Sequence, residues 1–369
     1  MEKKEKKVGI EMLRIISMYM ILILHYKLHQ NISELSIVNY KISSFIDILC
    51  VCALNCYVLI SGYFLSKSIT SSKKLLKVLY PVWFYNLLIL IIYLCYTHEK
   101  IKINGLLQFL FPVSLGEYWF VLCYTVMYLL IPYLKKIIEN TTREELKRLI
   151  AILLFVSFLS NMLVNSNIYC NIIDKTRGYG IIWLITLFLC AAYIRKYNLE
   201  NRFSRGSLII GFIVSSVLSY LSAIFINRIN AYDKICFNSN MLSDYNSINI
   251  FMNSIFLFLV FLQTDIKSKV IRKSITSISC LTFGVYIIHC QPLIFREIYV
   301  KFLKIQDYVM SKNYLLIMLG KCALLFALCC AIEKVRQLIF KEIQMLIESL
   351  KKRINTKITD KKGTITNEK

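Results

Sequence analysis

Long apolar runs separated by short polar segments fill most of this chain. Ten of them are long enough to cross a bilayer, whose hydrocarbon core is about 30 Å thick. They are residues 9–28, 42–65, 76–97, 118–134, 149–164, 178–194, 207–226, 248–263, 278–295 and 315–332. The pattern predicts an all-α polytopic membrane protein with about ten transmembrane helices.

Composition and charge support this interpretation. Of the 369 residues 57% are hydrophobic and the mean hydropathy is +0.57, which is too apolar for a soluble domain of this length. The net charge of +23 comes mainly from Lys and Arg in alternate connecting segments. That asymmetry predicts that both termini are cytoplasmic. It also explains the positive charge by topology and attraction to anionic lipids, without nucleic-acid binding.

The two ends of the chain differ in character. The charged N-terminus is followed directly by the first apolar run, without a small-residue cleavage site, so we expect an uncleaved first span. Residues 333–354 carry apolar positions at helical spacing among many Lys and Arg, which predicts a basic amphipathic helix on the inner membrane surface. We expect residues 1–332 to form the membrane domain, and the polar residues 355–369 to be disordered.

The first apolar run contains the clearest candidate chemistry, Arg14 and His25. Eleven residues are roughly three helical turns, so both side chains share one face, ~16 Å apart along the axis. An arginine is a permanent cation suited to phosphate, and a histidine is the usual general base near neutral pH. The alternative is that Arg14 reaches the cytoplasmic boundary by snorkelling and that His25 is an interfacial residue without chemistry.

Three lysines and two small polar residues form the next candidates. Lys73, Lys74 and Lys77 cluster on one helix face before the third span, as a phosphate site would, although cytoplasmic positive charge alone produces the same cluster. In the second span Asn55 is a buried amide that needs a partner. Ser61 lies beside a glycine, where ordinary close helix packing is the alternative explanation.

The outer ends of two other spans supply the remaining candidates. Glu117 begins the fourth span beside Trp119, where an interfacial aromatic belt is the simpler interpretation. His289 lies in the ninth span shortly before Pro292, which loosens a helix; a structural hydrogen bond is its alternative role. Most of the thirteen cysteines lie in apolar runs and none forms a CxxC pair, so we expect no metal. Cys170 and Cys236 fall in outside loops, but nothing in the sequence favours a disulfide between them.

Several stretches occur together in an order typical of one family. They are the Arg14–His25 spacing, NCYVLISGYFL at 55–65, the lysines at 73–77, EYWFVLCYTVMYLLIPYL at 117–134, GYGIIWLITLFLCAAYIRKY at 178–197, SDYNSINIF at 243–251 and TFGVYIIH at 282–289. Together they resemble the acyltransferase-3 family of integral membrane proteins, in particular the polysaccharide O-acetyltransferases of bacterial envelopes. The resemblance covers nearly all the predicted spans. The basic motif departs from it, being all lysine where the family commonly has arginine.

This resemblance implies transfer of an acyl group, usually acetyl from cytoplasmic acetyl-CoA, to a sugar hydroxyl presented outside or on a lipid-linked glycan. The expected location is the bacterial plasma membrane. Catalytic candidates are His25, as base or as nucleophile, with Glu117 and His289 as orienting groups. Arg14 and the three lysines are the candidates for donor binding. The candidates for acceptor binding are Asn55, Ser61, Trp119 and Tyr286.

A second class of function fits the same residues. A transporter or flippase for a lipid-linked sugar or small anion also lines its path with ionisable side chains. It differs from an acyltransferase because it yields no covalent product. The acceptor glycan, the length of the acyl group and the oligomeric state are left open by the sequence.

Overall fold

The computed structural model describes residues 7–97, 109, 112–113, 118–165, 177–233, 238 and 241–366. Within these ranges the chain is helical and contains no strand. The main helices are α1 (Val8–Leu28), α2 (Ile37–Leu65), α3 (Ser72–Thr97), α5 (Trp119–Asn140), α6 (Arg143–Asn165), α7 (Ile181–Lys196), α8 (Arg205–Asp233), α9 (Ile248–Leu262), α10 (Lys269–Ser279), α11 (Thr282–His289) and α13 (Tyr314–Thr366). Short helical turns are η1 (Ile32–Glu34), η2 (Leu199–Asn201), α12 (Phe295–Glu297), η3 (Ile298–Phe302) and η4 (Ile305–Tyr308). The prediction of an all-α polytopic membrane protein is confirmed.

Every predicted span overlaps with helix, but the helices differ in length. In the described part of the chain, eight candidate spans are long and apolar enough to cross a membrane. α7 and α9 have only 16 and 15 residues. α7 is nonetheless well enclosed, with ten buried residues. The count of ten spans and the cytoplasmic placement of both termini therefore stay predictions.

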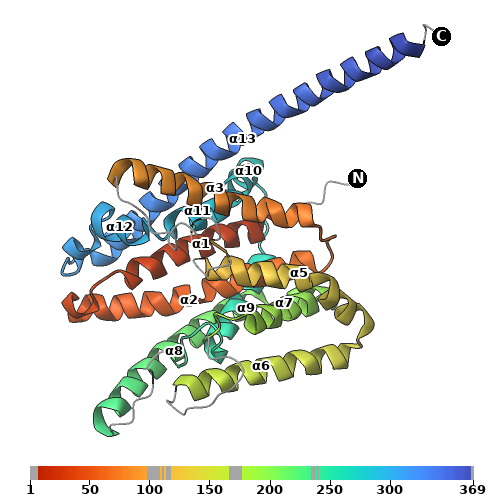
Figure 1. The fold of residues 1–369 in the computed structure, drawn as a ribbon. Helices are drawn as coiled ribbons and strands as arrows, with labels where there is room; N and C mark the ends of the chain where they lie inside the picture. Colours follow the sequence, from red (N-terminus) through yellow and green to blue (C-terminus); the bar gives the residue numbers. More distant parts are fainter. Residues whose placement is uncertain are drawn as a thin grey trace.

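The helices pack as a bundle around α1, α2 and α7 (Figure 1). One core cluster joins α2 with α5, α6, α7 and α9, and a second joins α1 with α2, α3, α11 and α13. The two clusters meet along α2, whose neighbours differ at its two ends. Gly62 allows α2 and α7 to approach closely, because a Cβ there would lie 2.8 Å from the Phe188 Cα of α7. α1, which carries Arg14 and His25, is thus held on several sides by other helices.

The ninth predicted span is interrupted in the structure. We predicted one apolar helix over 278–295, whereas α10 ends at Ser279 and α11 begins at Thr282 and ends at His289. α10 is strongly amphipathic and was not predicted, because its apolar positions are interspersed with Ser, Thr, Lys and Arg. α11 ends before Pro292, which cannot donate a helical hydrogen bond. The break places the start of α11 beside α1.

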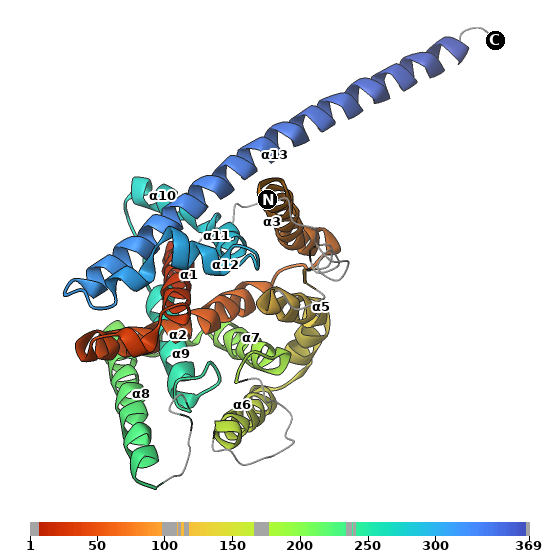
Figure 2. The same ribbon diagram turned by 60° about the vertical axis from the view of Figure 1, so that its left-hand side comes forward.

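The last predicted boundary also differs. α13 continues without interruption from the tenth span through 333–354 to Thr366, so the basic segment is no separate helix and the tail expected to be disordered is helical to that residue. Figures 1 and 2 show this helix leaving the bundle as a straight rod. The reason is that polarity changes near residue 332 while the helix-forming tendency does not. Glu333 is itself buried, where its carboxylate accepts hydrogen bonds from Tyr85 at 2.7 Å and from Arg336 at 2.8 Å.

Candidate active site

Two predicted catalytic residues meet at the ends of α1 and α11. His25 lies in the last turn of α1, and His289 is the last residue of α11. The Nδ1 atom of His25 lies 3.0 Å from the Nε2 atom of His289, which is hydrogen-bonding distance. His289 is fully buried, whereas His25 is half-buried. Residues 264 positions apart are therefore brought into one pair.

The hydrogen-bond network defines which nitrogen of each ring carries the proton. The Nδ1 atom of His289 lies 2.6 Å from the carbonyl oxygen of Val285, which can only accept, so this nitrogen donates. In the neutral ring the Nε2 atom then has the lone pair and accepts from the Nδ1–H of His25. The Nε2 atom of His25 is left with a lone pair, which is the form that a general base needs.

Cys290 is a third side chain at this pair. Its Sγ atom lies 3.3 Å from Nε2 of His289 and 3.6 Å from Nδ1 of His25. The ligand atoms of the three residues lie within 4.8 Å of one another, a geometry that also suits a soft divalent cation. This cysteine was not among the residues predicted for the site, although its position next to His289 was an available signal.

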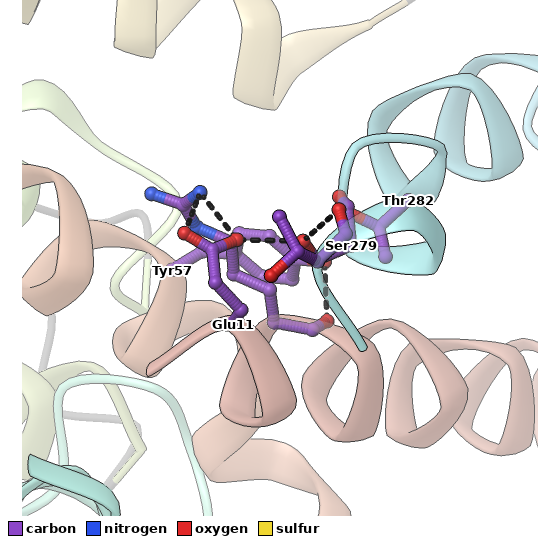
Figure 3. A network of polar contacts seen from close by, with 6 residues as sticks. Glu11, Tyr57, Ser279 and Thr282 are labelled. Atoms are coloured by element: carbon purple, nitrogen blue, oxygen red, sulfur yellow. Dashed lines mark hydrogen bonds and ion pairs between the residues drawn. The ribbon is translucent and has the colours of Figure 1, made fainter. Parts of the chain in front are cut away.

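At the other end of α1, Arg14 is held in a polar network. Its Nη1 atom donates to both carboxylate oxygens of Glu11, at 3.1 and 3.2 Å. Glu11 is buried, and it also accepts a hydrogen bond of 2.6 Å from the hydroxyl of Ser279 (Figure 3). Tyr57 of α2 donates to the carbonyl oxygen of Arg14 at 2.7 Å, and Thr282 donates to that of Ser279 at 2.9 Å.

This network turns Arg14 into an oriented cation. A buried carboxylate is costly without partners, and here the guanidinium and the hydroxyl supply them. The arginine side chain is 33% exposed, against 6% for the glutamate, so part of the guanidinium remains available to an anion. Glu11 was not among the residues predicted for the site. Its spacing of three residues from Arg14 was the signal for this ion pair.

Aromatic rings extend outward from the histidine pair. The ring of Tyr286 lies 6.2 Å from that of His289 and 6.0 Å from that of Phe120. Trp119 is the neighbour of Phe120, with ring centroids 6.0 Å apart, and it lies 4.6 Å from Tyr179. Two predicted acceptor-binding residues, Tyr286 and Trp119, therefore belong to one continuous row of rings that ends at the histidines.

The other two predicted acceptor-binding residues have structural surroundings. Asn55 is fully buried; its amide nitrogen donates to the carbonyl oxygen of Tyr245 at 2.9 Å, and its amide oxygen accepts from the Trp183 indole at 3.0 Å. Both polar ends are thus used to fix α7 and the segment before α9. Ser61 is half-buried next to Gly62, where α2 packs closely against α7. Their part in binding an acceptor stays a prediction.

The remaining predicted residues belong neither to the histidine pair nor to the polar network around Arg14. Lys73, Lys74 and Lys77 are exposed in the first turns of α3, and the ammonium group of Lys74 donates to the carbonyl oxygen of Ile69 at 2.6 Å. Glu117 lies outside the described residues. So do the two cysteines at positions 170 and 236.

His29 was overlooked although it follows His25 by one helical turn. Its ring lies 4.4 Å from that of Phe295 and 5.2 Å from that of Tyr299. Burial and the nearby positive charge of Arg296 lower the pKa of His29 below its ordinary value. This histidine therefore stays neutral near pH 7 and packs against the rings that surround the site.

The comparisons with known proteins identify the family of the chain. A family model described as an acyltransferase domain matches residues 7–334, nearly the whole chain, from the start of α1 to the buried Glu333 region of α13. Neither a curated protein nor a solved structure matches significantly. The match includes both ends of α1 with their partners on α10 and α11. The chain is thus a membrane acyltransferase and belongs to the acyltransferase-3 family.

Proposed function

We propose that the protein moves an acyl group, specifically acetyl, from cytoplasmic acyl-CoA to a hydroxyl of an extracytoplasmic or lipid-linked cell-envelope glycan. The proposed location is the plasma membrane of a bacterium. The observation that carries the proposal is the oriented pair of His25 and His289, because it leaves a lone pair on Nε2 of His25. Family membership supplies the acyl transfer itself.

The chemistry follows from the assigned proton positions. Nε2 of His25 accepts the proton of the acceptor hydroxyl while the hydroxyl oxygen attacks the thioester carbonyl carbon. The carbon–sulfur bond breaks, and the CoA thiolate leaves and takes up the proton. His289 accepts a hydrogen bond from the Nδ1–H of His25 throughout, which stabilises the imidazolium form. A histidine nucleophile that carries the acyl group for a short time is compatible with the same arrangement.

In this proposal Arg14 binds the acyl donor. It lies eleven residues before His25 on the same face of α1, so a donor anchored near it can extend along the helix. Its permanent charge and planar guanidinium suit a phosphate or a carbonyl oxygen of the donor arm. The row of rings at Tyr286 and Trp119 suits the apolar faces of a sugar at the acceptor side.

The test is His25→Ala, with His29→Ala as matched control. Both changes remove an imidazole from the outer end of α1, but His29 has no part in the proposed chemistry. Acyl transfer from radiolabelled acetyl-CoA to envelope glycan should fall by about 10²–10⁴-fold in the first variant and by no more than a few-fold in the second. Both should be compared at equal membrane abundance. Near-normal acylation by the His25 variant would show that the assignment is wrong, and flipping of a lipid-linked sugar without acylation would favour a transporter.

A further inference from the structure

The amphipathic helix α10 forms a basic pocket with the start of α1. The pocket has a volume of about 270 Å³ and is lined by Val8, Arg272, Lys273, Thr276 and Ser277. It contains two cationic side chains, two hydroxyl groups and one apolar residue. None of the lysines proposed from the sequence lines it, so it is a separate candidate for an anion.

The lining chemistry fits phosphate. A guanidinium binds phosphate oxygens through paired hydrogen bonds, an ammonium adds a point charge, and hydroxyl groups donate to the remaining oxygens. Arg272 also faces the Asp265 carboxylate at 3.7 Å, but the aspartate side chain is 76% exposed. A surface ion pair of that kind is weak, and a phosphate group competes with the carboxylate for the guanidinium.

The position of the pocket connects it with Arg14. Thr276 accepts a hydrogen bond through its carbonyl oxygen from Ser279, and the same Ser279 hydroxyl donates to Glu11. Along α1, Val8 precedes Arg14 by six residues, or ~9 Å, and His25 lies a further ~16 Å on. The pocket, the oriented arginine and the catalytic histidine thus follow one another along a single helix.

We propose that this pocket binds the phosphate groups of the nucleotide part of the acyl-CoA donor, and that the pantetheine arm extends from it past Arg14 toward His25. The inference rests on the proposed acyl transfer and names where its donor is anchored. Lys73, Lys74 and Lys77 of α3 do not line this pocket. A phospholipid headgroup offers the same chemistry, so the experiment has to separate the two sources.

The test compares the double variant Arg272→Gln/Lys273→Gln with a double control, Lys147→Gln/Arg148→Gln on α6. The control also removes two adjacent positive charges near a helix start, away from the pocket. Binding of adenosine 3′,5′-bisphosphate to the purified full chain in neutral-lipid nanodiscs is measured by calorimetry. We expect about 10- to 100-fold weaker binding in the pocket variant and unchanged binding in the control. Equal binding by pocket variant and wild type overturns the inference.

Kinetics then separates the donor from lipid. In the pocket variant the KM for acetyl-CoA should rise, whereas the KM for S-acetylpantetheine, which lacks the nucleotide and its phosphates, should not change. An equal rise for both donors, or an effect seen only in anionic-lipid nanodiscs, overturns the inference in favour of a lipid headgroup. The calorimetric measurement does not depend on acyl transfer. If the protein transfers no acyl group but the bisphosphate binds in this pocket, the proposed function is wrong and the anion site is still supported.

Discussion

Replacing His289 tests whether the histidine pair works through its hydrogen bond. His289→Leu removes the acceptor for the Nδ1–H of His25, whereas His289→Gln places an amide oxygen where Nε2 stood. Leaving a buried donor without a partner costs about 1–3 kcal/mol. If that cost falls on the reactive orientation of His25, kcat drops about 5- to 150-fold, since each 1.36 kcal/mol is tenfold in rate. The glutamine variant should recover most of this loss.

The assay is CoA release from acetyl-CoA by purified protein with acceptor glycan present. His289 acts through His25, so kcat should fall while the KM for acetyl-CoA stays within about twofold. Thermal unfolding of each variant controls for loss of the bundle. A leucine variant with normal kcat, or a glutamine variant as slow as the leucine variant, would refute the reasoning, because neither result fits a role for an acceptor at this position.

Three further predictions follow from other parts of the structure. Arg14→Lys keeps the charge but loses the planar guanidinium, so the KM for acetyl-CoA should rise several-fold in steady-state assays. Glu11→Gln should raise the KM in the same way, because it releases the guanidinium from its carboxylate partner. An unchanged KM in both variants would exclude Arg14 from donor binding. Metal chelators should leave acyl transfer intact, because the thioester chemistry needs no metal. Added Zn²⁺ should inhibit acyl transfer by binding the histidine pair, and Cys290→Ser should weaken that inhibition. If Zn²⁺ inhibits the serine variant as strongly as the wild type, the ion does not act at this site. Single cysteines introduced on η2 and η4 should react with impermeant thiol reagents from opposite sides of the membrane; labelling from one side would contradict the ten-span topology.

The sequence predicted the helices of the bundle because membrane spans depend mainly on long apolar runs. It predicted Arg14 and His25 on one face because their spacing matches the helical period. It also identified His289 through the cost of an ionisable residue in an apolar run. These features are local, so residues close in the chain carry the whole signal.

What the sequence did not show depends on contacts between distant segments. The pairing of His25 with His289, and of Glu11 with Ser279, joins α1 to α11 and α10 across more than 260 positions. Asn55 was interpreted as a residue for substrate, yet both ends of its amide are used by neighbouring segments. α10 was missed because it is amphipathic and lies outside the longest apolar runs.

Because Arg14 and His25 lie on the same uninterrupted helix, α1 keeps the distance between them constant. Both groups belong to one rigid element, so the separation of the donor end from the reacting end, ~16 Å, does not change when other helices move. In the proposed reaction the acyl group reaches His25 on its own carrier, and the proposal needs no domain movement to deliver it. One residue inserted between the two would turn His25 by about 100° away from His289, so the proposed chemistry depends on this spacing.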